Sequence, residues 1–65
     1  MRLKINGEWI ECRAATVSAL LEELGVNALA VAVEVNLVIV KKKDFLTFAL
    51  KEEDHLEIVN FVGGG

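Results

Sequence analysis

The sequence predicts a small α+β domain of two layers, in which one amphipathic helix lies across one face of a mixed β-sheet of four to five strands. Length is the first observation, because 65 residues make one small domain. The second is the apolar pattern, which has period two near both ends of the chain and helical spacing between them. The third is composition: nine valines and four isoleucines favour strands, and a hydrophobic content of 54% argues against disorder.

Residues 1–12 predict a β-hairpin. Apolar and polar residues alternate up to Ile5, and Asn6-Gly7 follows, a pair preferred in two-residue turns because both positions need positive φ. Such a turn fixes the register, and the expected pairs are Met1 with Cys12, Leu3 with Ile10, Arg2 with Glu11, and Lys4 with Trp9. On one face this register joins apolar residues. On the other it predicts an ion pair and a cation over an indole ring.

Residues 17–24 predict one short helix. Thr16 is a suitable N-cap, and Gly25 suits the left-handed position that ends a helix. Apolar residues recur at intervals of three and four and form one stripe, made of Val17, Leu20, Leu21 and Leu24. Glu22 and Glu23 lie at the negative end of the helix dipole, where carboxylates are mildly unfavourable. Two interpretations stay open for them, a solvated face or contact with a basic partner.

Residues 29–40 predict two further strands. The strand 29–35 has its odd-numbered valines facing inward, Asn36-Leu37 forms a turn, and 38–40 is a short edge strand. The basic run Lys41–Lys43 is expected to shield that edge from other chains, with phosphate binding as the weaker alternative.

Residues 44–62 complete the predicted fold. Asp44 is expected to cap a short helical turn carrying Phe45, Phe48 and Ala49, and a charged turn at 51–54 leads to the last strand, 56–62. This strand is expected to return parallel to the first. The predicted core between sheet and helix is Leu3, Ile5, Ile10, Leu20, Leu21, Leu24, Val33, Leu56 and Ile58.

Few residues carry chemistry, and their pattern argues against an enzyme. A metal site needs three or four convergent ligands, whereas the chain has one histidine and one cysteine. Cys12 is expected in the core, His55 on the solvated surface, and Ser18 has no base nearby in the sequence. No glycine-rich phosphate loop precedes a helix. We therefore expect no catalytic residue, no metal ligand and no bound cofactor.

Charge and hydropathy exclude other classes of protein. The net charge of −3 repels phosphate backbones, which argues against nucleic-acid binding. No apolar run approaches the ~18 residues of a membrane span, and the first residues lack the layout of a signal peptide. A single cysteine excludes an intramolecular disulfide and fits a reducing compartment. The sequence thus predicts a cytoplasmic protein without membrane or nucleic-acid partners.

The chain ends in Gly63-Gly64-Gly65, which divides it into a domain, 1–62, and a flexible tail, 63–65. One interpretation is a frayed terminus. The other is a peptide that enters another protein's active site, since a backbone without Cβ atoms passes a narrow channel and leaves the last carbonyl unhindered. A terminal carboxylate can be activated there as an acyl adenylate.

Over its full length the sequence resembles the ThiS family of thiamine-biosynthesis sulfur carriers. The resemblance rests on four segments: Ile5-Asn6-Gly7-Glu8, Thr16-Val17 with Leu20-Leu21, Ala30 to Asn36, and Glu57 to Gly65. It implies the β-grasp, or ubiquitin-like, topology. Members of this family often have a glycine in the 51–54 turn, where this chain has Glu53, and a proline after the fourth strand, where it has Val40-Lys41.

The resemblance implies that an E1-like adenylating enzyme uses ATP to adenylate the Gly65 carboxylate. A persulfide sulfur from a donor enzyme then displaces AMP, and the resulting thiocarboxylate delivers sulfur to a thiazole synthase. Gly63 and Gly64 would form the tail. Three alternatives stay open: a molybdopterin-synthase small subunit, a ubiquitin-like protein modifier, and a non-covalent interaction domain. Their products differ, being a thiocarboxylate, a protein conjugate, or neither.

A docking surface is expected on the face of the sheet away from the helix. Val59 and Phe61 should point there and share that face with Trp9, while Glu57 nearby would steer a basic partner. As the alternative, Phe61 folds over the edge of the core.

Overall fold

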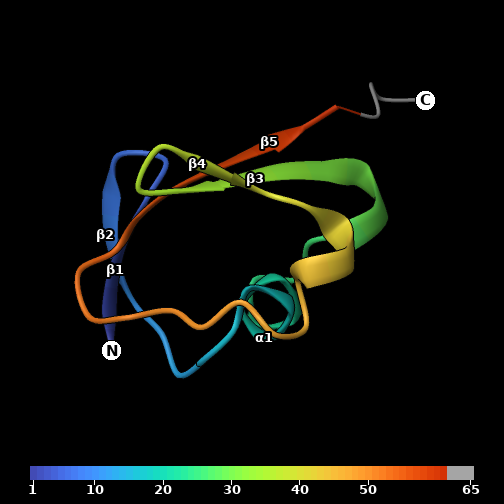
Figure 1. Ribbon diagram of the computed structural model, residues 1–65. Coiled ribbons are helices and arrows are strands. Elements are labelled where there is room, and N and C mark those ends of the chain that lie inside the picture. The colour runs from blue at the N-terminus through green and yellow to red at the C-terminus, as the bar shows by residue number, and fades with distance from the viewer. Residues whose placement is uncertain (62–65) are drawn as a thin grey trace.

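The computed structural model describes residues 1–61, which form a curved five-stranded sheet around one helix (Figure 1). The strands are β1 (Arg2–Ile5), β2 (Glu8–Glu11), β3 (Val31–Val35), β4 (Val38–Val40) and β5 (His55–Asn60), and the helix is α1 (Val17–Glu23). Two 3₁₀ turns, η1 (Ala28–Ala30) and η2 (Lys42–Asp44), flank the second strand pair. The sheet order is β2-β1-β5-β3-β4, with β1 and β5 parallel and the other neighbours antiparallel. The predicted mixed sheet is confirmed.

The predicted register of the β1–β2 hairpin is confirmed, with Leu3 opposite Ile10 and Lys4 opposite Trp9. The expected ion pair between Arg2 and Glu11 is wrong. The Arg2 guanidinium instead lies 4.0 Å from the centroid of the Trp9 ring, and the amino group of Met1 approaches Glu11 Oε2 at 3.2 Å. A planar guanidinium stacks well on an indole. The N-terminal amino group takes the place of Arg2 as the positive partner of Glu11.

Both predicted caps of α1 are confirmed. The Thr16 hydroxyl accepts a hydrogen bond from the Ala19 N–H at 3.2 Å. At the other end Gly25 has φ 71°, its N–H donates to Glu22 O, and the Val26 N–H donates to Leu21 O. These two bonds form a Schellman motif, which satisfies carbonyls that the end of a helix leaves open.

Glu23 has a structural partner that the sequence does not reveal. Its carboxylate accepts hydrogen bonds from the backbone N–H groups of Arg13 and Ala14, at 3.1 and 3.0 Å. The last turn of α1 therefore holds the loop that connects β2 to the helix. Both Glu22 and Glu23 are exposed, as a solvated face requires, and Glu23 makes these backbone contacts in addition.

Three predicted boundaries are wrong. The strand expected from residue 29 begins at Val31, because Asn27 Oδ1 accepts from the Leu29 N–H at 2.9 Å and starts the turn η1. The turn expected to begin at Asp44 begins after Lys41, and Asp44 contributes its backbone carbonyl, not its side chain. The last strand begins at His55 and ends at Asn60, whereas Val62 lies outside the described residues.

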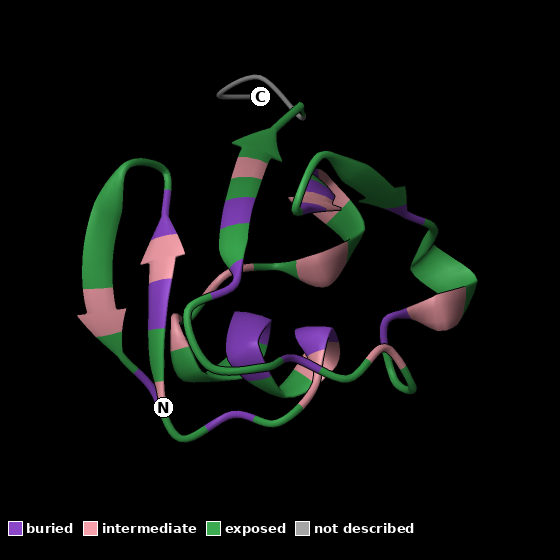
Figure 2. Cartoon of the chain, turned by 60° about the vertical axis from the view of Figure 1, so that its left-hand side comes forward, coloured by how far each residue is buried: buried purple, intermediate pink, exposed green. Residues whose placement is uncertain are grey.

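The core lies between the sheet and α1, as Figure 2 shows by the buried residues on the helix and at alternate positions of the strands. All nine predicted core residues are either buried or packed against the buried cluster. The inward positions expected for Cys12, Val17, Val31 and Val35 are also buried, whereas the sequence prediction omitted Ala14, Val40, Phe45, Leu50 and Asp54.

Candidate functional site

The sheet face opposite α1 carries the residues predicted to dock a partner. His55, Glu57 and Val59 alternate on β5 with the inward residue Leu56 and the half-buried Ile58. The cross-strand pairs place Lys4 beside both Trp9 and His55, Glu34 beside Glu57, and Ala32 beside Val59. Trp9, Val59 and Phe61 are 43%, 56% and 55% exposed. The expectation that these residues share one face is met.

This open face nevertheless divides into two separate apolar areas. The Trp9 ring meets His55 edge-on, with centroids 5.7 Å apart, at the beginning of β5. Val59 lies four residues further along the strand, which corresponds to about 13 Å. Glu57 and its cross-strand neighbour Glu34 lie between them. Trp9 therefore does not form a continuous patch with Val59 and Phe61, although one docking surface was predicted for all three.

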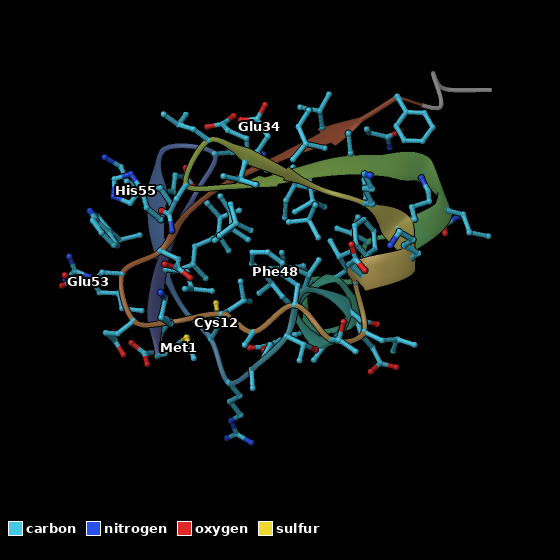
Figure 3. All side chains as sticks on the ribbon, in the orientation of Figure 1. Met1, Cys12, Glu34, Phe48, Glu53 and His55 are labelled. Atoms are coloured by element: carbon cyan, nitrogen blue, oxygen red, sulfur yellow. The ribbon has the colours of Figure 1, made fainter. Side chains whose placement is uncertain are left out.

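A shallow acidic hollow lies at the start of β5, beside the turn that joins β3 to β4. It measures about 480 Å³ and is lined by Glu34, Asn36, Leu37, Glu53, His55, Leu56 and Glu57. Figure 3 shows Glu34, Glu53 and His55 directed away from the core, whereas Cys12 and Phe48 lie in the interior between the sheet and α1. Three carboxylates give this hollow a negative potential, which favours a cationic group on any partner that covers it.

Phe61, the last described residue, stays at the surface. Its backbone N–H donates to Ala30 O at 3.0 Å, which extends the contact between β5 and the start of β3 by one residue. Its ring lies 4.5 Å from Lys42 Nζ. The alternative in which Phe61 folds over the core is wrong. The predicted tail residues, Gly63, Gly64 and Gly65, lie outside the described residues.

Two asparagines hold β5 in place, a role that was not predicted from the sequence. Asn6 has φ 50°, and its amide pairs with the backbone of Ile58, donating to the carbonyl at 3.1 Å and accepting from the N–H at 2.8 Å. Asn36 has φ 51° and donates to the buried Asp54 carboxylate while accepting from the His55 N–H, both at 2.9 Å. The two hairpin turns thus fix the strand that leads to the glycines.

Cys12 is a core residue, as expected. It is 2% exposed, and its Sγ contacts Ile10 O at 3.6 Å. Burial, assisted by the negative charge of Glu23, raises the pKa of the thiol above its ordinary value. Because the thiolate is the reactive form, Cys12 is a poor nucleophile at neutral pH.

The described part of the chain, residues 1–61, contains no group of three or more His, Cys, Asp or Glu side chains placed to hold a metal ion. Within the same residues, no helix has the length and apolar character needed to cross a membrane.

Comparison with solved structures confirms the β-grasp fold. The crystal structure of the thiamine biosynthesis protein ThiS from Geobacter metallireducens superimposes with a TM-score of 0.84, at 33% sequence identity and over the whole of both chains. The solution structure of a thiamine biosynthesis protein from the same organism gives a TM-score of 0.80.

Sequence relatives differ in length from this chain. A protein named thiazole synthase from Paramagnetospirillum magneticum is 53% identical over 66 residues, which cover all of this chain and 20% of that protein. The chain thus spans about a fifth of its length, and the same holds for a thiazole synthase of Magnetococcus marinus. An uncharacterized protein, ycf40 of Pyropia yezoensis, is 36% identical over 97% of this chain and 90% of its own length. The ThiS family model matches residues 3–65, so this chain belongs to the ThiS family.

Proposed function

We propose that this chain is a sulfur carrier, in which the carboxylate of Gly65 becomes a thiocarboxylate that supplies sulfur for the thiazole ring of thiamine. The observation that carries the proposal is the family match, which extends through Gly65. The name of the Geobacter metallireducens structure, a thiamine biosynthesis protein, supports the pathway. The two relatives named thiazole synthase support such an enzyme as the sulfur acceptor.

The chemistry takes place in partner enzymes and requires a free α-carboxylate on Gly65. In an E1-like adenylating enzyme a carboxylate oxygen attacks the α-phosphorus of ATP, pyrophosphate leaves, and an acyl adenylate forms. The terminal sulfur of a persulfide on a donor enzyme attacks the activated carbonyl, and AMP leaves with the electron pair of the C–O bond. A second thiol then cleaves the S–S bond, which releases the thiocarboxylate and leaves a disulfide on the donor side.

The described residues contribute docking and placement to this reaction. Val59 and Phe61 form the apolar area at the end of β5, from which the chain continues toward the glycines. Glu57 and Glu34 give the adjacent surface a negative charge, which steers a basic partner. Trp9 is a second, separate contact about 13 Å along the sheet. Phe61 precedes Gly65 by four residues in the sequence, and this short separation supports docking beside the adenylation site.

The reach of the tail provides the test of the proposal. One residue appended after Gly65 is expected to stop AMP formation by the adenylating enzyme, because a displacement of ~1 Å from reactive geometry costs about a hundredfold in rate. Deletion of Gly65 should act in the same way, and Gly64→Ala should slow the reaction through its added Cβ. Circular dichroism should be unchanged in all three variants. An extended chain that forms AMP at the wild-type rate would contradict the proposal.

Docking is tested separately by isothermal calorimetry with the adenylating enzyme. Phe61→Ala is expected to weaken binding while the fold is retained, since aromatic anchors dominate interfaces. Leu46→Ala is the matched control, because Leu46 is 77% exposed and belongs to no strand. Equal affinities of the two variants would exclude Phe61 from the interface.

A further inference from the structure

Lys42 contacts the residue at which the described chain ends. Its Nζ lies 4.5 Å from the centroid of the Phe61 ring and donates to Val31 O at 3.4 Å. Phe61 is itself bonded through its N–H to Ala30 O. One ammonium group therefore connects three segments: the turn η2, the start of β3 and the residue that follows β5.

The sheet topology explains why the side chain reaches this place. β4 ends at Val40, which pairs with Val33, so the Val31 carbonyl lies beyond the last residue of β4. Lys42 donates to that carbonyl where the strand no longer extends. Lys42 thus satisfies a β3 carbonyl next to the end of β4, and shielding of the β4 edge by the three lysines stays a prediction.

The two neighbouring lysines carry the same charge as Lys42 but lie elsewhere. Lys43 Nζ lies 3.6 Å from Asp44 Oδ1, and within residues 1–61 neither Lys41 nor Lys43 contacts the Phe61 ring. Three consecutive lysines thus carry the same charge, and only Lys42 among them contacts the Phe61 ring within residues 1–61. Substitutions of Lys41 and Lys43 therefore serve as charge-matched controls for substitution of Lys42.

We infer that Lys42 is a positioning residue that holds Phe61, four residues before Gly65, in place for binding by the partner. The inference rests on the proposed sulfur-carrier function. A segment held before association loses less conformational freedom on binding, and this improves capture by the partner. Once the carrier is bound, the carboxylate occupies the same site with or without Lys42. Loss of the contact therefore raises KM for the adenylating enzyme and leaves kcat unchanged.

The contact itself is tested by NMR without any partner. Methylene protons next to a cation on a ring face are shifted upfield by the ring current. We expect this shift for the Lys42 side chain, its loss in Phe61→Leu, and no comparable shift for Lys41 or Lys43. Lys42 signals identical to those of Lys41 would overturn the inference, whatever the chain's function.

The role is tested by steady-state AMP formation with Lys42→Met, Lys41→Met and Lys43→Met. We expect KM to rise about two- to fivefold for Lys42→Met alone, as for an exposed cation–π contact, with kcat unchanged and with Lys42→Arg restoring the wild-type value. Equal increases in all three variants would assign the effect to net charge and overturn the inference. A wild-type chain that forms no AMP would instead contradict the proposed function, and the role of Lys42 with it.

A double-mutant cycle excludes direct contact of Lys42 with the partner. If Lys42 acts by holding Phe61, then Lys42→Met should leave KM unchanged in a Phe61→Leu background. Additive increases in KM would mean that Lys42 binds the partner independently, and would overturn the positioning role.

Discussion

At the scale of single residues, two turns with nearly the same backbone differ in one residue. Asn6-Gly7 has φ values of 50° and 86°, and Asn36-Leu37 has values of 51° and 71°. The left-handed region suits glycine and is unfavourable for a leucine, whose Cβ approaches the backbone there. Leu37 is 90% exposed, so burial of its side chain does not offset this cost.

Leu37→Gly is therefore expected to stabilise the protein. The relief of left-handed strain exceeds the added entropy of the unfolded chain, and the net gain is about 0.5–1 kcal/mol. The measurement is the free energy of unfolding from urea titration. Gly7→Ala is the reverse control and should lose about 1 kcal/mol from backbone strain alone, because an added Cβ there meets no atom within 4 Å. A destabilised Leu37→Gly variant would show that Leu37 makes contacts that its exposure does not reveal.

Cys12 predicts how stability changes at alkaline pH. Burial raises the pKa of its thiol in the folded state above the ordinary value of 9.0, so above that pH the folded chain retains a proton that the unfolded chain loses. This contribution to stability is complete below pH 9.0 and decreases as pH rises toward the folded-state pKa. Unfolding free energies measured at several pH values should therefore fall more steeply for the wild type than for Cys12→Ala. Parallel curves for the two proteins would contradict the assigned pKa.

For the two asparagines, the backbone conformation was predicted from the sequence and the side-chain hydrogen bonds were not. Asn6 and Asn36 were both predicted as turn residues, since Asn tolerates positive φ. Their side-chain bonds to Ile58 and Asp54 were not predicted, because these partners lie 52 and 18 residues away and meet only after the sheet has formed. The local sequence pattern therefore predicts the turn, but it does not predict the residue that the asparagine side chain binds.

At the scale of elements, Glu23 fastens the loop before α1 to the end of the helix. Glu23→Ala removes the acceptor of the Arg13 and Ala14 N–H groups and is expected to cost about 1 kcal/mol, because the site is exposed and water partly replaces the carboxylate. Glu22→Ala is the matched control, with the same charge in the same turn, and should change stability little. The comparison is made by thermal and urea unfolding. Equal effects of the two substitutions would exclude the loop contact.

Element types were predicted more accurately than their ends. The hairpin register followed from the two-residue turn, and the helix from its stripe and both caps. The start of β3 was misplaced because Asn27 caps a 3₁₀ turn, although Leu29 and Ala30 fit an apolar strand equally well. The turn at residues 42–44 was misplaced because an aspartate was assumed to cap through its side chain.

At the scale of the whole molecule, the sheet order brings the residues predicted to dock a partner to one face. β5 pairs with β1 and β3 and is central, which positions it firmly, and its last residues lead to the glycines. Strand alternation was sufficient to predict that Trp9, Glu57, Val59 and Phe61 share the open face. It was not sufficient to predict that Glu34 and Glu57 separate Trp9 from the others, because that depends on which strands are neighbours.

The central claim is that the Gly65 carboxylate accepts sulfur, and mass spectrometry of the intact chain tests it most directly. The chain is incubated with its adenylating enzyme, ATP and a persulfide donor, and a sample without ATP serves as control. The account predicts the exchange of one oxygen for one sulfur, located at Gly65 by fragmentation and absent without ATP. An unchanged mass with the cognate enzymes, or a sulfur located at Cys12 instead of Gly65, would contradict it.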